Sequence, residues 1–353
     1  MMKSNARFWH ILEGEKIQCD LCPRQCILLS DQKGYCGVRE NHHGQLMSLV
    51  YGKTSGFCID PIEKKPLYHF YPGTGVLSFG TGGCNLGCIF CQNWRITKIK
   101  DLSFLTEHAT PEKIVQAAKN YNCKSIAFTY NEPVIFAEYV IDTARLCREN
   151  GIKTIVVTSG YITSHAQPEF FEFIDAANVD LKGFSDRFYK DLVQAKLQPF
   201  LDTLLYIKKH TKIWLEITNL LIPGENDDPK EIDQMTLWIR NNLGDDVPLH
   251  FSAFFPSYKL LDKPATPPET LIRAREIALT NGLKYVYTGN VAHRTGSITS
   301  CHKCQTALIE REWFEIKNFN LINGCCPKCN TPCAGFFDAE QGLWGDKREP
   351  VNI

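Results

Sequence analysis

Short runs of β-branched and other apolar residues alternate with longer amphipathic stretches through residues 74–291. The runs that predict strands cover 75–80, 124–130, 153–158, 178–181, 212–222 and 249–255, with one more expected at 284–287. Helical periodicity lies between them, near 110–120, 134–149, 167–176, 186–209, 229–242 and 268–281. Strands that alternate with helices in this way predict right-handed βαβ units and a parallel sheet.

Six or seven such units predict an α/β fold, namely a full or partial (β/α) TIM-like barrel. A Rossmann sheet is disfavoured because no G-x-G-x-x-G segment follows the first predicted strand. In barrels of parallel strands, the functional groups lie at the carboxyl ends of the strands. We therefore expect the site in the segments that directly follow the predicted strands, beginning with residues 81–91.

Two smaller regions flank the barrel, and both are rich in cysteine. Residues 1–73 show turn residues and little helical periodicity, which predicts a cysteine-rich metal-binding region and a strap that leads into the barrel. The polar run 60–69 of this strap either covers the barrel mouth, with its lysines or His69 near a substrate, or only joins the two units. Residues 292–353 return to paired cysteines and predict a small zinc-ribbon-like unit.

Composition disfavours several classes of function. Lys plus Arg and Asp plus Glu both number 39, so the formal charge is zero and gives no global attraction to nucleic acid or an anionic membrane. No apolar run approaches the roughly 20 residues of a membrane span, and no secretory signal is seen. We therefore expect a cytoplasmic protein. In that reducing setting, the clustering of the 16 cysteines indicates metal thiolates rather than disulfides.

The cysteine loop after the first predicted strand has the spacing C-x3-C-x2-C, at Cys84, Cys88 and Cys91. Three thiolates so spaced can hold three corners of a [4Fe–4S] cluster. A ferredoxin normally supplies four cysteines per cluster, so here the fourth iron is left open to another molecule. Zinc is a poorer match because a closed structural zinc site normally takes four ligands.

This loop, placed directly after the first strand of a βα barrel, resembles the cluster loop of the radical S-adenosylmethionine (SAM) superfamily. The resemblance implies that the open iron binds the amino and carboxylate groups of SAM, and that reductive cleavage yields a 5′-deoxyadenosyl radical. Asn131 and Glu132 take the place of the superfamily's Gly-Gly-Glu-like segment, which meets the SAM amino group. The glycine pair itself is absent, and a simple turn into a helix is the alternative.

Later strand ends add further candidates. Asp180 and Lys182 resemble the Asp-x-Lys segment that lies near SAM and the substrate peptide in glycyl-radical activating enzymes, with a surface ion pair as the alternative. Asn219 or Thr218 is a candidate contact for the SAM ribose or carboxylate. The cation site of those enzymes is not implied, because residues 157–160 lack its acidic residue. His250 is either a core histidine or a catalytic group.

Residues 19–39 and 60–70, together with the loop at 83–94, resemble the radical SAM proteins of the AmmeMemoRadiSam system, which are related to pyruvate formate-lyase activating enzymes. The resemblance covers most of the chain, including the C-terminal cysteine pairs. It implies SAM and a [4Fe–4S] cluster as cofactors. It supplies no substrate, because analogy of fold does not establish function.

The flanking regions each carry a possible metal quartet. The N-terminal set suits either tetrahedral zinc or a second [4Fe–4S] cluster, and it comprises Cys19, Cys22, Cys26 and Cys36. The C-terminal set is two C-x2-C knuckles of the zinc-ribbon kind, made by Cys301, Cys304, Cys326 and Cys329. Cys325 and Cys333 compete for places in this second quartet. Lys303 and Lys328 at the knuckle tips are candidate nucleic-acid contacts, and the alternative is a ribbon that docks a protein or staples the fold.

Together these features predict a radical SAM oxidoreductase of the activating-enzyme type, reduced by a protein such as flavodoxin or ferredoxin. Its candidate substrates are a glycyl-radical protein, another protein, RNA or a metabolite. The alternatives are a metal-dependent module that binds nucleic acid or protein, and a two-cluster electron carrier. The missing fourth cysteine of the central loop disfavours both, because full ligation would protect the cluster of a carrier.

Overall fold

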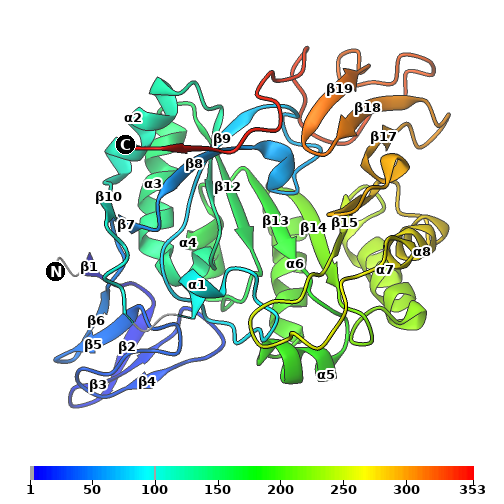
Figure 1. Ribbon diagram of the computed structural model, residues 1–353. Coiled ribbons are helices and arrows are strands. Elements are labelled where there is room, and N and C mark those ends of the chain that lie inside the picture. The colour runs from blue at the N-terminus through cyan, green and yellow to red at the C-terminus, as the bar shows by residue number, and fades with distance from the viewer. Residues whose placement is uncertain (1–3, 99–100) are drawn as a thin grey trace.

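A mostly parallel sheet forms the centre of the molecule in the computed structural model, which describes residues 4–98 and 101–353 (Figure 1). Its parallel strands follow one another in the chain and in the sheet: β9 (Gly75–Phe79), β11 (Ser125–Phe128), β12 (Lys153–Thr158), β13 (Ala176–Asp180), β14 (Trp214–Leu221), β15 (Leu249–Ala253) and β16 (Val286–Gly289). Each pairs in parallel register with its neighbour, as Phe79 does with Phe128. The predicted parallel sheet is confirmed.

The sheet is open, so the full barrel that was one form of the prediction is not observed. Among the described residues, β16 pairs only with β15 and therefore forms an edge. On the other side, β8 (Phe57–Pro61) pairs antiparallel with β9, and β20 (Glu349–Val351) pairs antiparallel with β8. An antiparallel pair thus occupies the side on which a closed barrel would continue with parallel strands.

Helices connect the parallel strands, as the periodicity predicts. They are α2 (Pro111–Asn120), α3 (Ala137–Glu149), α4 (Gln167–Phe171), α6 (Gln198–His210), α7 (Pro229–Leu243) and α8 (Pro268–Thr280), with the short turns α1 (Trp94–Thr97) and η2 (Pro133–Phe136). Thr110 caps α2 by accepting from the Lys113 N–H, and Pro111 holds the first helical position. None of the described helices combines the length and apolar character that crossing a membrane requires.

The stretch 186–209 is not one helix, in contrast to the prediction. The helical turn α5 (Asp186–Phe188) passes into the π-helical turn η3 (Tyr189–Val193), which ends at Gln194 with a left-handed φ of 56°. The Val193 carbonyl accepts a hydrogen bond from the Gly87 N–H at 2.9 Å. The helix breaks because its last turn uses its carbonyls on the cysteine loop instead of on the next helical turn.

The N-terminal unit consists of small antiparallel sheets. One contains β1 (Ser4–Asn5), β6 (Gln45–Ser48) and β5 (Arg39–His42), another contains β2 (Trp9–Glu13), β3 (Lys16–Cys19) and β4 (Ile27–Leu28), and β7 (Lys53–Thr54) pairs with β10 (Glu107–His108). A buried ion pair between Arg39 and Glu138, 2.9 Å long, fastens this unit to α3.

The strap fills the amino end of the central sheet. After β8 it forms the turn η1 (Ile62–Lys64), and its Leu67 and Phe70 pack with Val76 and Ile155 in a buried cluster. The C-terminal ribbon lies beside the strap (Figure 1) and contains η4 (Arg294–Ser297), β17 (Thr299–Ser300), β18 (Ala307–Glu312) and β19 (Glu315–Phe319). The amino end of the sheet is therefore occupied by protein, and the carboxyl end holds the cysteine loop.

Candidate radical SAM site

The three cysteines of the central loop converge on one cavity at the carboxyl end of the sheet. Cys84, Cys88 and Cys91 follow β9 and line a cavity of ≈ 240 Å³. The ends of β11 to β15 supply further groups to its wall, among them Glu132, Thr158, Asp180, Lys182, Thr218 and Ser252. This is the location that a parallel-stranded barrel predicts for functional groups.

Asn131 holds the start of the cysteine loop. Its Nδ2 donates to Thr81 Oγ1 at 3.0 Å and to the Gly83 carbonyl at 3.1 Å, and its Oδ1 accepts from the Thr81 N–H at 3.0 Å. The nitrogen and the oxygen of this side-chain amide are thus both hydrogen-bonded within the protein. A direct contact between Asn131 and SAM stays a prediction. Gly83 itself has a left-handed φ of 86°, a conformation that glycine adopts readily.

Glu132 is a buried carboxylate on the cavity wall. Its Oε2 accepts from the Ser159 N–H at 2.8 Å, and its Oε1 accepts from the Thr158 hydroxyl. Burial raises the pKa of Glu132, while the hydrogen bonds from Thr158 and Ser159 and the charge of Lys182 oppose that rise. Because a carboxylate oxygen can accept more than one hydrogen bond, Oε2 retains capacity for a ligand N–H.

Asp180 and Lys182 form an ion pair, but it faces the cavity rather than the outer surface. Lys182 Nζ lies 2.8 Å from Asp180 Oδ2, and the lysine side chain is 15% exposed. Burial acts to lower the pKa of Lys182, but the charges of Asp180 and Cys88 outweigh it and raise the pKa. Lys182 therefore stays charged beside the Cys88 thiol and brings a cation to the wall of the cavity.

Asn219 does not line the cavity, although its neighbours in β14 do. Successive side chains of a strand point to opposite faces, and Thr218 and Leu220 are the β14 residues on the cavity wall. The Asn219 Nδ2 instead donates to the Leu181 carbonyl at 2.7 Å. The site that we propose therefore excludes Asn219 and includes Thr218.

Two side chains that belong to no sequence motif also contact the cysteine loop. Lys98 Nζ donates to the Leu86 carbonyl, and its charge acts on the Cys84 and Cys88 thiols. Ser257, in the loop after β15, donates from Oγ to the Cys91 carbonyl at 3.1 Å. The position of Ser257 just beyond a strand end was the one available signal, whereas Lys98 has no recognisable motif.

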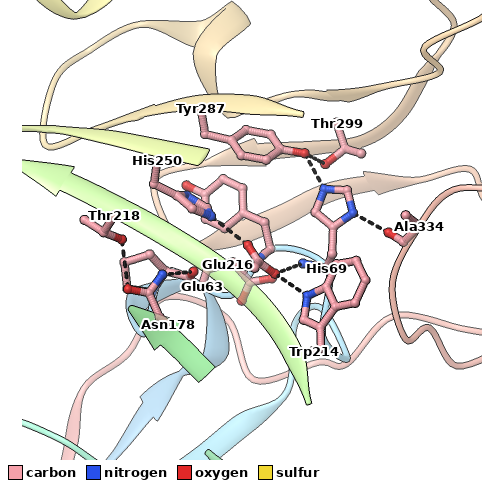
Figure 2. A network of polar contacts seen from close by, with 12 residues as sticks. Glu63, His69, Asn178, Trp214, Glu216, Thr218, His250, Tyr287, Thr299 and Ala334 are labelled. Carbon is pink, nitrogen blue, oxygen red and sulfur yellow. Dashed lines mark hydrogen bonds and ion pairs between the residues drawn. The ribbon is translucent and has the colours of Figure 1, made fainter. Parts of the chain in front are cut away.

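A buried network of polar side chains lies around the amino half of β14 (Figure 2), and of its labelled residues Thr218 also lines the cavity. Glu216 accepts four hydrogen bonds: from the N–H groups of Tyr68 at 3.0 Å and His69 at 2.8 Å, from Trp214 Nε1 at 2.9 Å and from His250 Nε2 at 2.6 Å. An ionised carboxylate only accepts, so His250 Nε2 carries the proton of that contact. This geometry favours the core-histidine interpretation of His250.

The strap joins the N-terminal unit to the central sheet and fills the amino end of that sheet. It does not cover the cavity at the carboxyl end. The His69 ring lies in the same network, where Nε2 contacts the Tyr287 hydroxyl at 2.5 Å and Nδ1 contacts the Ala334 carbonyl at 2.6 Å. Burial lowers the pKa of His69 to about 4, so its ring is neutral at ordinary pH. Lys65 is buried against Asp60 at 2.5 Å. Neither residue lines the cavity beside the cysteines.

Glu63 makes the stability of this network dependent on pH. Its Oε1 lies 3.7 Å from the buried Arg311 guanidinium, and burial raises the pKa of Glu63 to about 7 despite that charge. A carboxyl group whose pKa is higher in the folded than in the unfolded state stabilises most at low pH. This contribution is lost as the pH rises from the unfolded pKa to the folded one.

We therefore expect the free energy of unfolding of the Glu63→Gln variant to rise relative to that of the wild type as the pH rises from about 5 to about 8. Over this pH range, the difference in unfolding free energy between variant and wild type should change by up to about 3 kcal/mol. Urea denaturation of both proteins at several pH values measures it, with the exposed Glu312→Gln as control. A difference that does not vary with pH would contradict the assignment.

The C-terminal cysteines form a compact quartet. The Sγ atoms of the predicted set all lie within 4.8 Å of one another, and the set comprises Cys301, Cys304, Cys326 and Cys329. Tetrahedral zinc with bonds of about 2.3 Å places its sulfurs about 3.8 Å apart, so this donor set fits a zinc ion. The competing Cys325 and Cys333 lie outside the quartet, and the Cys333 Sγ approaches His69 Nδ1 at 3.9 Å.

The two knuckles repeat the same turn. A left-handed residue follows each second cysteine, Gln305 with φ 59° and Asn330 with φ 56°. A threonine hydroxyl then hydrogen-bonds each of those cysteines at 3.2 Å, and lowers the pKa of both thiols, that of Cys304 to about 6. Thiolates are the form that binds metal, so each turn prepares its cysteine as a ligand.

The N-terminal cysteines gather at the tip of β3 and β4. Cys19 is the last residue of β3, and its N–H donates to the Cys26 carbonyl just before β4 at 2.9 Å. The charges of Cys19, Cys26 and Cys36 all act on the thiol of Cys22 and, with burial, raise its pKa to about 12. That these four cysteines bind one metal group stays a prediction.

Comparison with known proteins assigns the chain to a class. The Radical SAM superfamily profile matches residues 79–235, which hold the cysteine loop and most of the cavity wall. An uncharacterized protein of Methanocaldococcus jannaschii is 45% identical over 316 residues, covering 90% of this chain and 94% of that protein. The chain belongs to the radical SAM superfamily, and membership implies a [4Fe–4S] cluster and SAM.

Within this superfamily the chain is homologous to activating enzymes. The pyruvate formate-lyase 1-activating enzyme of Escherichia coli strain K12 is 26% identical over 166 residues, covering 44% of this chain and 65% of that enzyme. A radical SAM methyltransferase from Sphaerobacter thermophilus superposes with a TM-score of 0.50 at 18% identity, over 63% of this chain and 68% of the other. The second likeness supports the fold alone.

Proposed function

We propose that this protein is a radical SAM enzyme of the activating-enzyme type that abstracts hydrogen from a protein substrate. The observation that carries the proposal is the donor set of the cavity. Three thiols line it, and among the described residues neither a fourth cysteine nor a histidine does. A [4Fe–4S] cluster held there would keep one iron free of protein ligands, as SAM binding requires.

The remaining wall suits the charged end of SAM. When the cluster and SAM are bound, reduction of the cluster supplies the electron that cleaves SAM into methionine and a 5′-deoxyadenosyl radical. Glu132 offers an acceptor for the ammonium group of SAM, and Lys182 offers a cation for its carboxylate. Thr158 and Ser159 hold the Glu132 carboxylate in place, and Asp180 holds Lys182.

Homology to activating enzymes supports a protein substrate. The name of the E. coli enzyme gives another protein, pyruvate formate-lyase 1, as its target. The C-terminal ribbon would then serve as a flanking structural unit rather than as a nucleic-acid reader. The formal charge of zero agrees with this, because RNA-binding proteins usually carry excess positive charge.

The test is the formation of 5′-deoxyadenosine. We expect the full chain, reconstituted anaerobically and reduced with dithionite, to release it from SAM. The C84A/C88A/C91A variant should fall to the background of the assay, because no cluster forms in the cavity. The matched control is Cys123→Ala, which removes a buried thiol outside all three cysteine groups.

Chromatography with isotope-labelled SAM quantifies the product. Wild-type protein that retains its cluster but releases no 5′-deoxyadenosine, with dithionite or with reduced flavodoxin, would contradict the proposed function. Equal release by the wild type and by the triple variant would contradict the assignment of the three cysteines.

A further inference from the structure

Backbone N–H groups point to the sulfurs of the N-terminal quartet. Each of its four cysteines receives a backbone N–H: Cys19 from Leu21, Cys22 from Arg24, Cys26 from Tyr35 at 3.4 Å, and Cys36 from Val38. Such N–H contacts to sulfur stabilise metal-bound thiolates and tune the potential of iron–sulfur clusters. The guanidinium group of the buried Arg39 also lies near Cys19 and Cys36, so a positive group faces the quartet.

The distances between the sulfur atoms distinguish a zinc site from an iron–sulfur cluster site. A single zinc ion draws four sulfurs to within about 3.8 Å of one another, whereas a cubane places each thiolate on a separate iron and so holds the sulfurs farther apart. In the C-terminal quartet all four Sγ atoms lie within 4.8 Å. Among the described residues, no three of the Sγ atoms of Cys19, Cys22, Cys26 and Cys36 meet that limit.

The central loop provides an internal comparison. Cys84, Cys88 and Cys91 line one cavity in a superfamily that carries a cubane, and their Sγ atoms also fail to lie within 4.8 Å of one another. Both sets of cysteines therefore differ from the C-terminal quartet, whose sulfurs do lie within that limit.

The quartet also lies directly against the cluster loop. A Cβ at Gly83 would lie 2.3 Å from the Cys36 carbonyl oxygen, so the backbone beside one ligand touches the backbone beside Cys84. From the same unit, Arg24 Nε donates to the Asn85 carbonyl at 3.0 Å. A group bound by the quartet would thus be separated from the central loop by little more than this contact.

From this arrangement we infer that Cys19, Cys22, Cys26 and Cys36 hold a second [4Fe–4S] cluster, which delivers electrons to the central one. In each transfer the second cluster loses one electron and is oxidised, and the central cluster gains that electron and is reduced. A low-potential one-electron donor protein of the flavodoxin or ferredoxin class then reduces the second cluster again. The relay role rests on the proposed function, whereas the binding of the cluster does not.

The metal content of the C84A/C88A/C91A variant tests the site without any SAM chemistry. Anaerobic reconstitution should give about eight irons and eight sulfides per wild-type chain, and about four of each in this variant, whose N-terminal quartet is intact. After reduction, its electron paramagnetic resonance signal should not respond to SAM. The complementary C22A/C26A variant should keep about four irons and a signal that SAM does change. Cys123→Ala should match the wild type.

Zinc analysis of the same samples supplies the opposing outcome. A folded triple variant without iron, with about two zinc ions per chain, would overturn the second cluster in favour of a zinc staple. Circular dichroism establishes that the variant is folded. The triple variant decides the question even where C22A/C26A fails to fold, and its iron content does not depend on whether the wild type cleaves SAM.

The relay has its own measurement. Reduced flavodoxin should reduce the central cluster at least about tenfold more slowly in C22A/C26A than in the wild type, while the small reductant dithionite reduces both. An unchanged rate with flavodoxin would overturn the relay.

Discussion

Replacement of Glu216 by alanine is expected to lower the free energy of unfolding by about 3–5 kcal/mol, the usual cost of removing one partner from a buried charged network. The carboxylate is fully buried and accepts hydrogen bonds from two backbone N–H groups, an indole and an imidazole. Its removal leaves these four buried donors without their acceptor. A loss of that size approaches the whole stability of many domains.

Urea denaturation followed by tryptophan fluorescence measures this effect, since Trp214 is itself one of the donors. Glu216→Gln is expected to lose less stability, because its amide oxygen still accepts. The matched control is Glu312→Ala, whose side chain is 71% exposed and whose loss should cost about 0.5 kcal/mol or less. A Glu216→Ala protein as stable as this control would show that the network does not stabilise the fold.

Loss of metal from the C-terminal quartet is expected to unfold the ribbon. Structural zinc sites contribute apparent binding free energies of about 10–16 kcal/mol, which small ribbons cannot replace by packing. The apolar cluster around Leu308, Ile309 and Leu321 includes Cys301 and Cys326, so a metal held by the quartet would adjoin this core. The ribbon also covers the strap, where Arg311 donates to the Tyr68 carbonyl at 2.8 Å.

Plasma emission analysis should find zinc in the wild type and should show that a C326S/C329S variant has lost the zinc of the C-terminal quartet. In this variant, hydrogen exchange of the backbone amides of β18 and β19 should be faster. Cys325→Ser is the control, since Cys325 adjoins the quartet but lies outside it. Protection of β18 and β19 that persists in the double variant would show that packing alone holds the ribbon. Iron in place of zinc would refute the choice of metal.

The strands and the cysteine groups could be predicted because their signals are local. A run such as 153–158 alternates with a helix, and a C-x2-C knuckle needs only a tight turn with a left-handed residue such as Gln305. Ligands within one loop are brought together by that loop alone. For the same reason, the convergence of the N-terminal cysteines follows from two neighbouring turns.

The network around Glu216 could not be predicted, because its members are distant in sequence and meet only through the sheet. The strap supplies Tyr68 and His69, and β16 supplies Tyr287. One signal was available, since a glutamate within a buried parallel strand needs partners. Strand alternation could likewise have favoured Thr218 over Asn219, because Thr218 lies on the same face as Leu220.

The pairing of β20 with β8 bears on how the chain matures. During synthesis, β8 and β9 leave the ribosome long before Glu349–Val351 has been made. Until then β8 presents a row of unpaired backbone groups next to the strand that leads to the cysteine loop, and such open edges recruit strands from other molecules. Nascent or truncated chains that lack β20 would therefore be prone to aggregate through this edge.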